Sequence, residues 1–205
     1  MPLMQISADE IRQIERLHVR AWPAFETADI HGWLWRYSGG GSQRANSVST
    51  VHFTGDDPAA AVDEAEARYR ARDAIVRFHT YDLSAPAGIT NLLEARGYRG
   101  GETTLTMVKA VTAAKAPDDV EVAAAANAEW QEVYLGAISE SRRSVNAKIL
   151  GSVPQPRGFF FLPARRTGDI ERAMRCRRRF RCYRMHGDAR RGAAAGRRGR
   201  GASQP

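Results

Sequence analysis

Cysteine is scarce in this chain, and long apolar runs are missing from it. The 205 residues include two cysteines, which is too few for a disulfide framework, so a reducing compartment is expected. No stretch approaches the roughly 18 consecutive apolar residues that a membrane span needs. The N-terminus lacks the basic lead and apolar core of a secretory signal. The sequence therefore predicts a cytoplasmic protein with no membrane partner.

Residues with the spacing of metal ligands are also lacking. No two histidines form an HxH or HxxxH pair, and Cys176 and Cys182 have no matching partners. The five histidines are scattered along the chain, at His18, His31, His52, His79 and His186. We expect no metal site.

Positive charge is concentrated at one end of the chain. The net charge is +8, yet residues 165–205 hold 14 Arg and three acids, a net of +11. The preceding 164 residues hold the other 17 basic and 20 acidic residues, a net of −3. No Leu, Ile or Val follows Ile170. Ordering a backbone costs about 1–2 kcal/mol per residue, which aliphatic burial must offset. We therefore expect residues 166–205 to form a basic, disordered tail.

The rest of the chain mixes the two kinds of secondary structure. A capping box at Ser7 and Glu10, a proline in a first turn at Pro58 and a C-cap at Gly97 delimit helices. Before a linker near residue 115, we expect helices over residues 7–20, 58–72 and 88–96, and strands over residues 32–37, 47–53, 75–81 and 103–111. After it, we expect a strand at residues 120–122, helices over 130–140 and 141–150, and a buried strand over 159–162. This pattern indicates an α/β or α+β fold.

Several of these segments resemble one enzyme family. The run from Leu92 to Tyr98, followed by the strand from Thr103, looks like the last helix and strand of a GNAT acetyltransferase domain. The segments Ala21–Ala24, Gly32–Arg36 and Arg44–Val48 resemble a bacterial GNAT subfamily in which a degenerate GNAT-like half precedes the acetyltransferase half. The order of strand, two helices, Pro154-x-Pro156 and strand is similar to the opening of a GNAT domain.

The resemblance covers about residues 7–165 and implies how the chain is divided. A GNAT-like mixed sheet flanked by helices is expected in a degenerate domain over residues 1–112. Residues 117–165 would then be the strand–helix–helix–strand start of a second, incomplete GNAT domain, and residues 166–205 the tail.

The family implies transfer of an acetyl group from acetyl-CoA to a small-molecule or peptide amine. Its cofactor loop, [Arg/Gln]-x-x-Gly-x-[Gly/Ala], lets backbone N–H groups at a helix start approach the pyrophosphate. Only Gly196-Arg-Arg-Gly199-Arg-Gly201 approaches this motif, so the candidate cofactor contacts are Gly196, Gly199 and Gly201. Gly196 occupies the first position of the motif, where the family has Arg or Gln. No strand is expected before this segment and no helix after it. No catalytic residue is assigned, because the family's catalytic tyrosine would follow the loop.

Two groups of polar residues allow two interpretations each. Arg44, Asn46 and Ser47 follow a glycine turn and either bind an anion or cap the turn and pair across strands, the latter being favoured. Three acids lie near where GNAT enzymes receive the amine, and each is either a general base acting through water or part of a solvated helix face: Glu129, Glu132 and Glu140.

The composition of the tail has a separate explanation. A segment rich in Arg, Ala and Gly is typical of GC-rich DNA translated in the wrong frame. Dropping one base at the codon for Met174 permits a hairpin with an Asp-Gly turn, and then Arg-Arg-Gln-Gly-x-Ala at residues 193–198. We expect a longer in-frame enzyme, with activity impaired in this chain.

Two other readings of the tail stay open. In one, the tail is genuine and binds nucleic acid through its arginines, a partner not expected otherwise. In the other, the chain is an incompletely folded remnant with exposed strand edges. The amine acceptor and the oligomeric state are left open.

Overall fold

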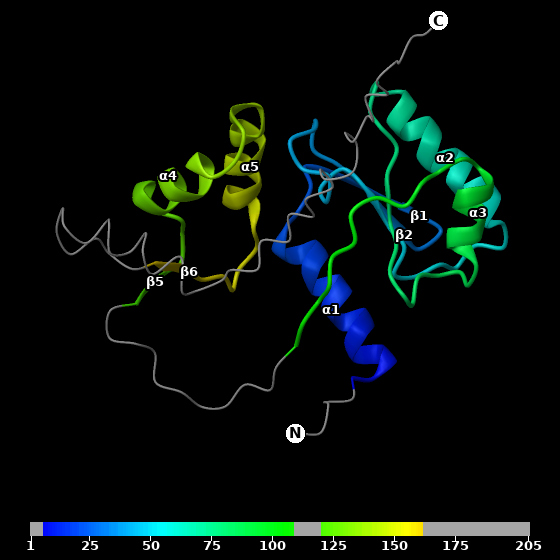
Figure 1. Ribbon diagram of the computed structural model, residues 1–205, viewed down its shortest axis with the longest axis horizontal. Coiled ribbons are helices and arrows are strands. Elements are labelled where there is room, and N and C mark those ends of the chain that lie inside the picture. Colours follow the sequence, from blue (N-terminus) through cyan, green and yellow to red (C-terminus); the bar gives the residue numbers. More distant parts are fainter. Residues whose placement is uncertain (1–5, 109–119, 162–205) are drawn as a thin grey trace, which may run out of the picture. The chain divides into compact units, whose positions relative to one another are not determined.

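The computed structural model describes residues 6–108 and 120–161 and shows a mixed α/β protein, as the sequence predicted (Figure 1). The described residues up to Arg99 and those from Val120 onward belong to one compact unit, and residues 100–108 belong to a second. The elements are α1 (Ala8–Ala21), β1 (Glu26–Ile30), β2 (Trp33–Tyr37), β3 (Val48–Ser49), α2 (Pro58–Arg70), β4 (Phe78–His79), α3 (Ile89–Ala95), β5 (Glu121–Ala123), α4 (Ala128–Gly136), α5 (Glu140–Ser152) and β6 (Phe159–Phe161).

Four strands form a mixed sheet in the order β1-β2-β3-β4. Antiparallel β1 and β2 pair from Glu26↔Tyr37 to Ile30↔Trp33. Their two-residue turn places His31 at φ 50° and Gly32 at φ 90°, the left-handed conformations typical of a tight hairpin. β2 and β3 are antiparallel, whereas β3 and β4 are parallel. The sequence analysis missed β1, because Glu26-Thr-Ala-Asp-Ile30 has little apolar content and becomes a strand through its pairing with β2.

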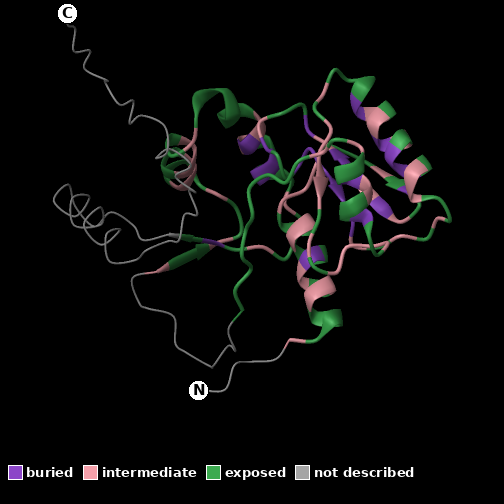
Figure 2. Cartoon of the chain, turned by 45° about the vertical axis from the view of Figure 1, so that its right-hand side comes forward, coloured by how far each residue is buried: buried purple, intermediate pink, exposed green. Residues whose placement is uncertain are grey.

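The two faces of β2 meet different surroundings. Alternate residues of a strand point to opposite faces. Trp33 and Trp35 are fully buried in a core that also contains Val62 and Tyr69 of α2 and Leu93 of α3. Buried residues accordingly gather on the strands and on the inner side of α2, while α4 has none (Figure 2). The opposite face of the strand carries a buried arginine instead of apolar residues.

The helix ends follow the sequence signals. Ser7 and Glu10 form the expected capping box at the start of α1. Pro58 is in the first turn of α2, which Asp57 caps, and Gly97 takes φ 87° after α3. Helix α2 ends at Arg70, two residues before the expected end.

Three expected strands are shorter than predicted or are not formed. The prediction over residues 47–53 corresponds to the two residues of β3, and that over 75–81 to the two residues of β4. Residues 103–108 form no strand, so the prediction over 103–111 was wrong for its described part. Leu105 and Met107 are 70% and 79% exposed. The alternation of apolar and polar residues in this segment therefore did not lead to the burial of either side chain.

From Val120 onward the described chain has the expected order of strand, two helices and strand. β5 pairs antiparallel with β6, from Glu121↔Phe161 to Ala123↔Phe159. Phe159 is 8% exposed but Phe160 is 66% exposed, so the prediction of a buried strand is confirmed for Phe159 and was wrong for Phe160. The ring of Trp130 of α4 packs edge-to-face against that of Phe159, and its indole N–H donates to the carbonyl of Phe160.

Several predictions lie outside the described residues. These are the linker near residue 115, the tail over residues 166–205 and the glycines Gly196, Gly199 and Gly201. Across residues 6–108 and 120–161, no helix combines the length and apolar character that crossing a bilayer requires.

Candidate functional site

The glycine turn after β2 is organised by one buried side chain. Gly39, Gly40 and Gly41 take φ values of 70°, 93° and 69°, which only glycine adopts readily. The Asn46 side chain accepts hydrogen bonds from the backbone N–H groups of Ser38 (2.8 Å) and Gly40 (3.3 Å). It also donates to the carbonyls of Gly40 (2.9 Å) and Ser42 (2.6 Å). The Asn46 amide is thus fully engaged in closing the turn.

The next residue, Ser47, is also engaged within the protein, and Arg44 takes part through its backbone carbonyl. The Ser47 hydroxyl donates to the Arg44 carbonyl and accepts a hydrogen bond from Arg36 Nη2, both over 3.0 Å. Arg36 Nε also donates to the Ser47 carbonyl over 3.3 Å. These contacts match the interpretation that the segment caps the turn and pairs across strands. They leave no free side-chain donor on Asn46 or Ser47 for an anion.

Arg36 belongs to a charge cluster, which we define as Glu15, His18, Arg36 and His79. Its side chain is 1% exposed, and burial lowers its pKa to about 10. Its Nη1 has no hydrogen-bond partner among the described residues. Glu15 of α1 is 8% exposed, and its carboxylate lies 3.4 Å from His18 Nδ1 and 3.8 Å from His79 Nδ1. The single negative charge of Glu15 favours the charged form of Arg36.

Stability is expected to fall as the pH is lowered from 7.5 to 5.5. Burial lowers the pKa of His79, although Glu15 opposes that shift. The unfolded chain therefore binds a proton at this histidine at higher pH than the folded chain does, so acid favours unfolding in this window. Urea unfolding across this range checks the slope. His79→Gln should flatten it, whereas His52→Gln, at an exposed histidine, should not. Equal slopes for the parent and His79→Gln would contradict the assignment.

The start of α2 has the form of an anion site but is already occupied. Pro58 has no N–H group, and the N–H groups of Ala59 and Ala60 donate to Asp57 Oδ1 over 2.8 and 3.1 Å. The Ala61 N–H donates to the Asp57 carbonyl. Every donor of the first turn is thus used, and the carboxylate there repels phosphate. This helix start does not fit the pyrophosphate of acetyl-CoA.

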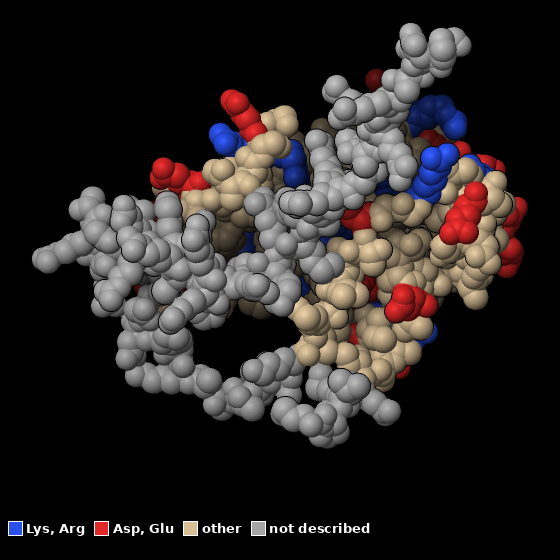
Figure 3. All heavy atoms as spheres, viewed as in Figure 1, with Lys and Arg blue, Asp and Glu red and all other residues tan. Residues whose placement is uncertain are grey.

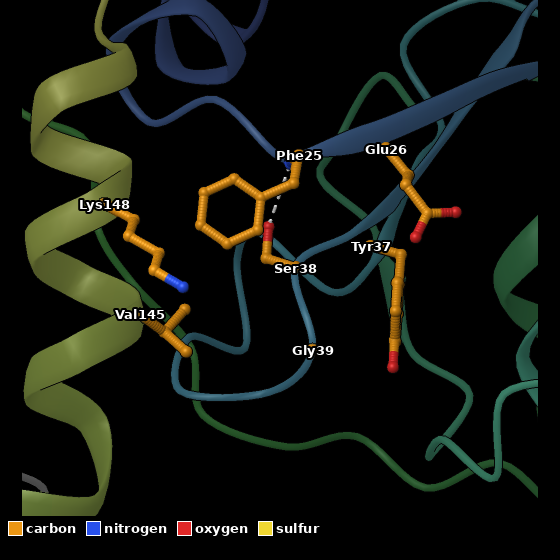
Figure 4. A pocket seen from close by; sticks show the side chains of 7 residues that line it. All are labelled: Phe25, Glu26, Tyr37, Ser38, Gly39, Val145 and Lys148. Carbon is orange, nitrogen blue, oxygen red and sulfur yellow. Dashed lines mark hydrogen bonds between the residues drawn. The ribbon is translucent and has the colours of Figure 1, made fainter.

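An open hollow of about 340 Å³ lies between the β1–β2 hairpin and α5 (Figure 4). Its lining combines apolar, aromatic and charged side chains, from Phe25, Glu26, Tyr37, Ser38, Gly39, Val145 and Lys148. Figure 4 shows the Lys148 side chain on the side of α5 that faces Phe25, with its ammonium near Val145, and the Glu26 carboxylate directed away from Lys148. The hollow therefore presents a cation beside an apolar wall.

Helix α5 is held against the glycine turn that borders the hollow. The Gly41 carbonyl accepts hydrogen bonds from Arg142 Nε (2.8 Å) and from Asn146 Nδ2 (3.0 Å). A Cβ added to Gly41 would lie 2.7 Å from the Cβ of Val145, so the two backbones approach closely. The Trp22 indole links the same turn to α4, because it donates to Ser42 Oγ over 2.8 Å and meets the ring of Tyr134 edge-on.

The acids proposed from sequence near the amine site do not line the hollow. They are exposed on α4 and α5 and match a solvated helix face: Glu129, Glu132 and Glu140. Among the described residues no group of three or more His, Cys, Asp or Glu side chains is placed to hold a metal ion. The candidate cofactor glycines, Gly196, Gly199 and Gly201, lie outside the described residues.

The sequence analysis missed the residues that give the hollow its chemistry. Phe25 and Lys148 are 123 positions apart, and no motif connects them. One weak signal was present: the chain has only three lysines, at positions 109, 115 and 148, and the last belongs to an expected helix.

Comparison with known proteins places the chain among acetyltransferases. It is 38% identical over 91 residues to a Bacillus subtilis (strain 168) protein named "Uncharacterized N-acetyltransferase YobR". That match covers 44% of this chain and 35% of the relative, so the chain spans about a third of the curated protein it matches. No solved structure matches the chain. A family profile matches residues 8–158, most of the described chain, and the chain belongs to the acetyltransferase family that it describes, "Probable histone acetyltransferase Rv0428c C-terminal".

Proposed function

We propose that the chain is a GNAT-type N-acetyltransferase that moves an acetyl group from acetyl-CoA to an amine. The observation that carries this proposal is the acetyltransferase family match over residues 8–158. The match extends across the four-stranded sheet and across β5, α4 and α5, and it ends one residue before β6. It therefore includes most of both parts of the tandem arrangement that the GNAT resemblance implies.

Two features support a degenerate first domain over residues 1–112 and a catalytic domain that starts at residue 117. The start of α2 has no free donor for a pyrophosphate, because Asp57 and its carbonyl take those of Ala59, Ala60 and Ala61. The later segment repeats the strand–helix–helix–strand order of a GNAT opening, with β5 and β6 antiparallel. Acetyl-CoA would then bind to residues that follow β6.

The chemistry that the proposal implies is direct transfer. The neutral amine nitrogen of a small molecule or peptide attacks the thioester carbonyl, so a C–N bond forms and the C–S bond breaks. The CoA thiolate leaves and takes up a proton, while the amine nitrogen loses one. A backbone N–H group stabilises the oxyanion, and no covalent enzyme intermediate forms.

The tail over residues 166–205 follows, in this proposal, from a shifted reading frame. It holds 13 arginines and no Leu, Ile or Val after Ile170, and one dropped base permits the missing cofactor motif. Sequencing the gene across codons 160–210 tests this directly. An inserted or missing base near codon 170 is the expected result, and an intact frame would show that the tail is genuine.

Acetyl transfer is tested by release of free CoA thiol in the presence of a panel of amines. The frame-restored protein should release thiol faster with at least one primary amine than without amine, and mass spectrometry should show that amine heavier by one acetyl group. The 205-residue chain should release thiol far more slowly. Absence of thiol release from the restored protein with every amine, together with no acetylated product, would contradict the proposal.

Nucleic-acid binding is a second candidate, and the net charge of +11 over residues 165–205 is the observation that favours it. The described surface does not extend that charge. Acidic and basic side chains lie side by side over α2 and α3 (Figure 3), where Arg68, Arg70 and Arg96 pair with Glu64, Glu66 and Asp63. Binding through the tail would weaken steeply with salt and would be abolished by deleting residues 165–205.

A further inference from the structure

The hollow between the β1–β2 hairpin and α5 holds an unneutralised cation. The Lys148 ammonium has no hydrogen bond or ion pair with another described residue, and it is directed into the hollow (Figure 4). The only acid that lines the hollow, Glu26, is paired elsewhere: its Oε2 accepts from Arg72 Nε (3.2 Å) and Arg72 Nη2 (2.6 Å). The hollow is therefore electropositive, and its cation is available to a ligand.

One polar group beside the lysine is both buried and able to donate. The Ser38 side chain belongs to a residue that is 2% exposed, and its Oγ accepts a hydrogen bond from the Phe25 N–H over 3.2 Å. Because that oxygen acts as the acceptor, its own proton is free to be donated to a ligand. An anion at the hollow would thus meet an ammonium group and a hydroxyl donor.

The rest of the lining is apolar or aromatic. The Phe25 residue is 45% exposed, so part of its ring is accessible to a ligand, and Val145 and the Tyr37 ring complete the wall. Arg72 lies over the Tyr37 ring, 5.4 Å from its centroid, and so fixes that ring from outside. A volume of about 340 Å³ is at the small end of the range of small-molecule sites.

We propose that this hollow binds a small organic carboxylate whose body is aromatic or branched aliphatic. The carboxylate would pair with the Lys148 ammonium and accept from the Ser38 hydroxyl, and the body would cover the Phe25 ring and Val145. The site is formed by α5 and by residues at the start of β1 and at the end of β2, and the contacts of Gly41 hold α5 beside the turn that follows β2. This inference does not depend on acetyl transfer and does not require the tail.

The probe is 3-phenylpropionate, titrated into the full chain and followed by amide NMR shifts. Its matched analogues are 3-phenylpropanol, which has no charge, and 3-phenylpropylamine, which has the opposite charge. The carboxylate should bind most tightly of the three and shift the amide signals of Phe25, Ser38, Gly39 and Val145. Tighter binding of the amine, or shifts confined to other parts of the chain, would overturn the proposal.

Lys148→Gln is the decisive variant, since Lys148 is exposed and its loss should leave the fold intact. It should weaken 3-phenylpropionate binding about fivefold, the effect expected for an exposed ion pair, while leaving 3-phenylpropanol unchanged. Arg143→Gln is the matched control, because it removes the same charge from the same helix outside the hollow. Equal weakening by both variants would show a general charge effect and would overturn the assignment of Lys148.

Discussion

Replacing Gly41 with alanine is expected to lower the free energy of unfolding by about 2–5 kcal/mol. The left-handed backbone at φ 69° costs a residue with a Cβ about 1–2 kcal/mol. The new Cβ would also lie 2.7 Å from the Cβ of Val145, and such overpacking typically costs about 1–3 kcal/mol. Urea unfolding measures the sum. Amide hydrogen exchange in α5 shows whether the helix separates from the turn.

Gly40→Ala is the matched control for that substitution. Gly40 has a φ of 93°, but a Cβ there would meet no atom within 4 Å. Gly40→Ala should lower the free energy of unfolding only by the cost of the left-handed backbone. The amides of α5 should exchange as slowly as in the parent protein. Equal losses of stability in the two variants, with no change in α5 exchange, would contradict the contact between the glycine turn and α5.

Asn46→Ala should cost about 3–5 kcal/mol of stability. Its 4% exposed amide accepts from two backbone N–H groups and donates to two carbonyls, and truncation leaves those four groups without that partner. Each buried polar group left unpaired costs about 1–3 kcal/mol, less where water enters the opened turn. Thermal and urea unfolding of the variant measure the loss.

The control for Asn46 is the exposed amide in the same turn. Gln43→Ala should change stability by less than about 0.5 kcal/mol, as exposed substitutions usually do. If Asn46→Ala were no more destabilising than Gln43→Ala, the turn would not depend on the hydrogen bonds of Asn46.

Local signals in the sequence predicted the helices well. The Ser7–Glu10 capping box and Gly97 act within a few residues of the helix ends they define, and each is found where expected. Asn127 was missed as the cap of α4, although its side chain accepts from the Trp130 N–H, because the helix was placed two residues too late.

The strands were predicted less well, because whether a segment forms a strand depends on its pairing with another segment of the chain. β1 has few apolar residues and forms through its register with β2. The Thr-rich segment at residues 103–108 has the alternation of a strand and does not form one. Phe159 and Phe160 are identical in type, yet the pleat buries one and exposes the other.

The candidate site depends on contacts that sequence spacing does not show. The charge cluster joins Glu15 to His79 across 64 positions, and the hollow joins Phe25 to Lys148. Arg36 falls within the strand predicted over residues 32–37, and the sequence did not show that this arginine is buried on the face opposite the two tryptophans. Asp57 was readable as a helix cap, but only the hydrogen bonds of Ala59 and Ala60 show that it closes an anion site.

Calorimetric titration with acetyl-CoA tests most directly the claim that this is an acetyltransferase whose first domain cannot hold the cofactor. The frame-restored protein should bind acetyl-CoA saturably, with a Kd in the range of about 1 μM to 1 mM that is usual for enzyme substrates. The 205-residue chain, which keeps the occupied start of α2, should show no saturation over the same range. No binding by the restored protein, or equally tight binding by the 205-residue chain, would contradict the account.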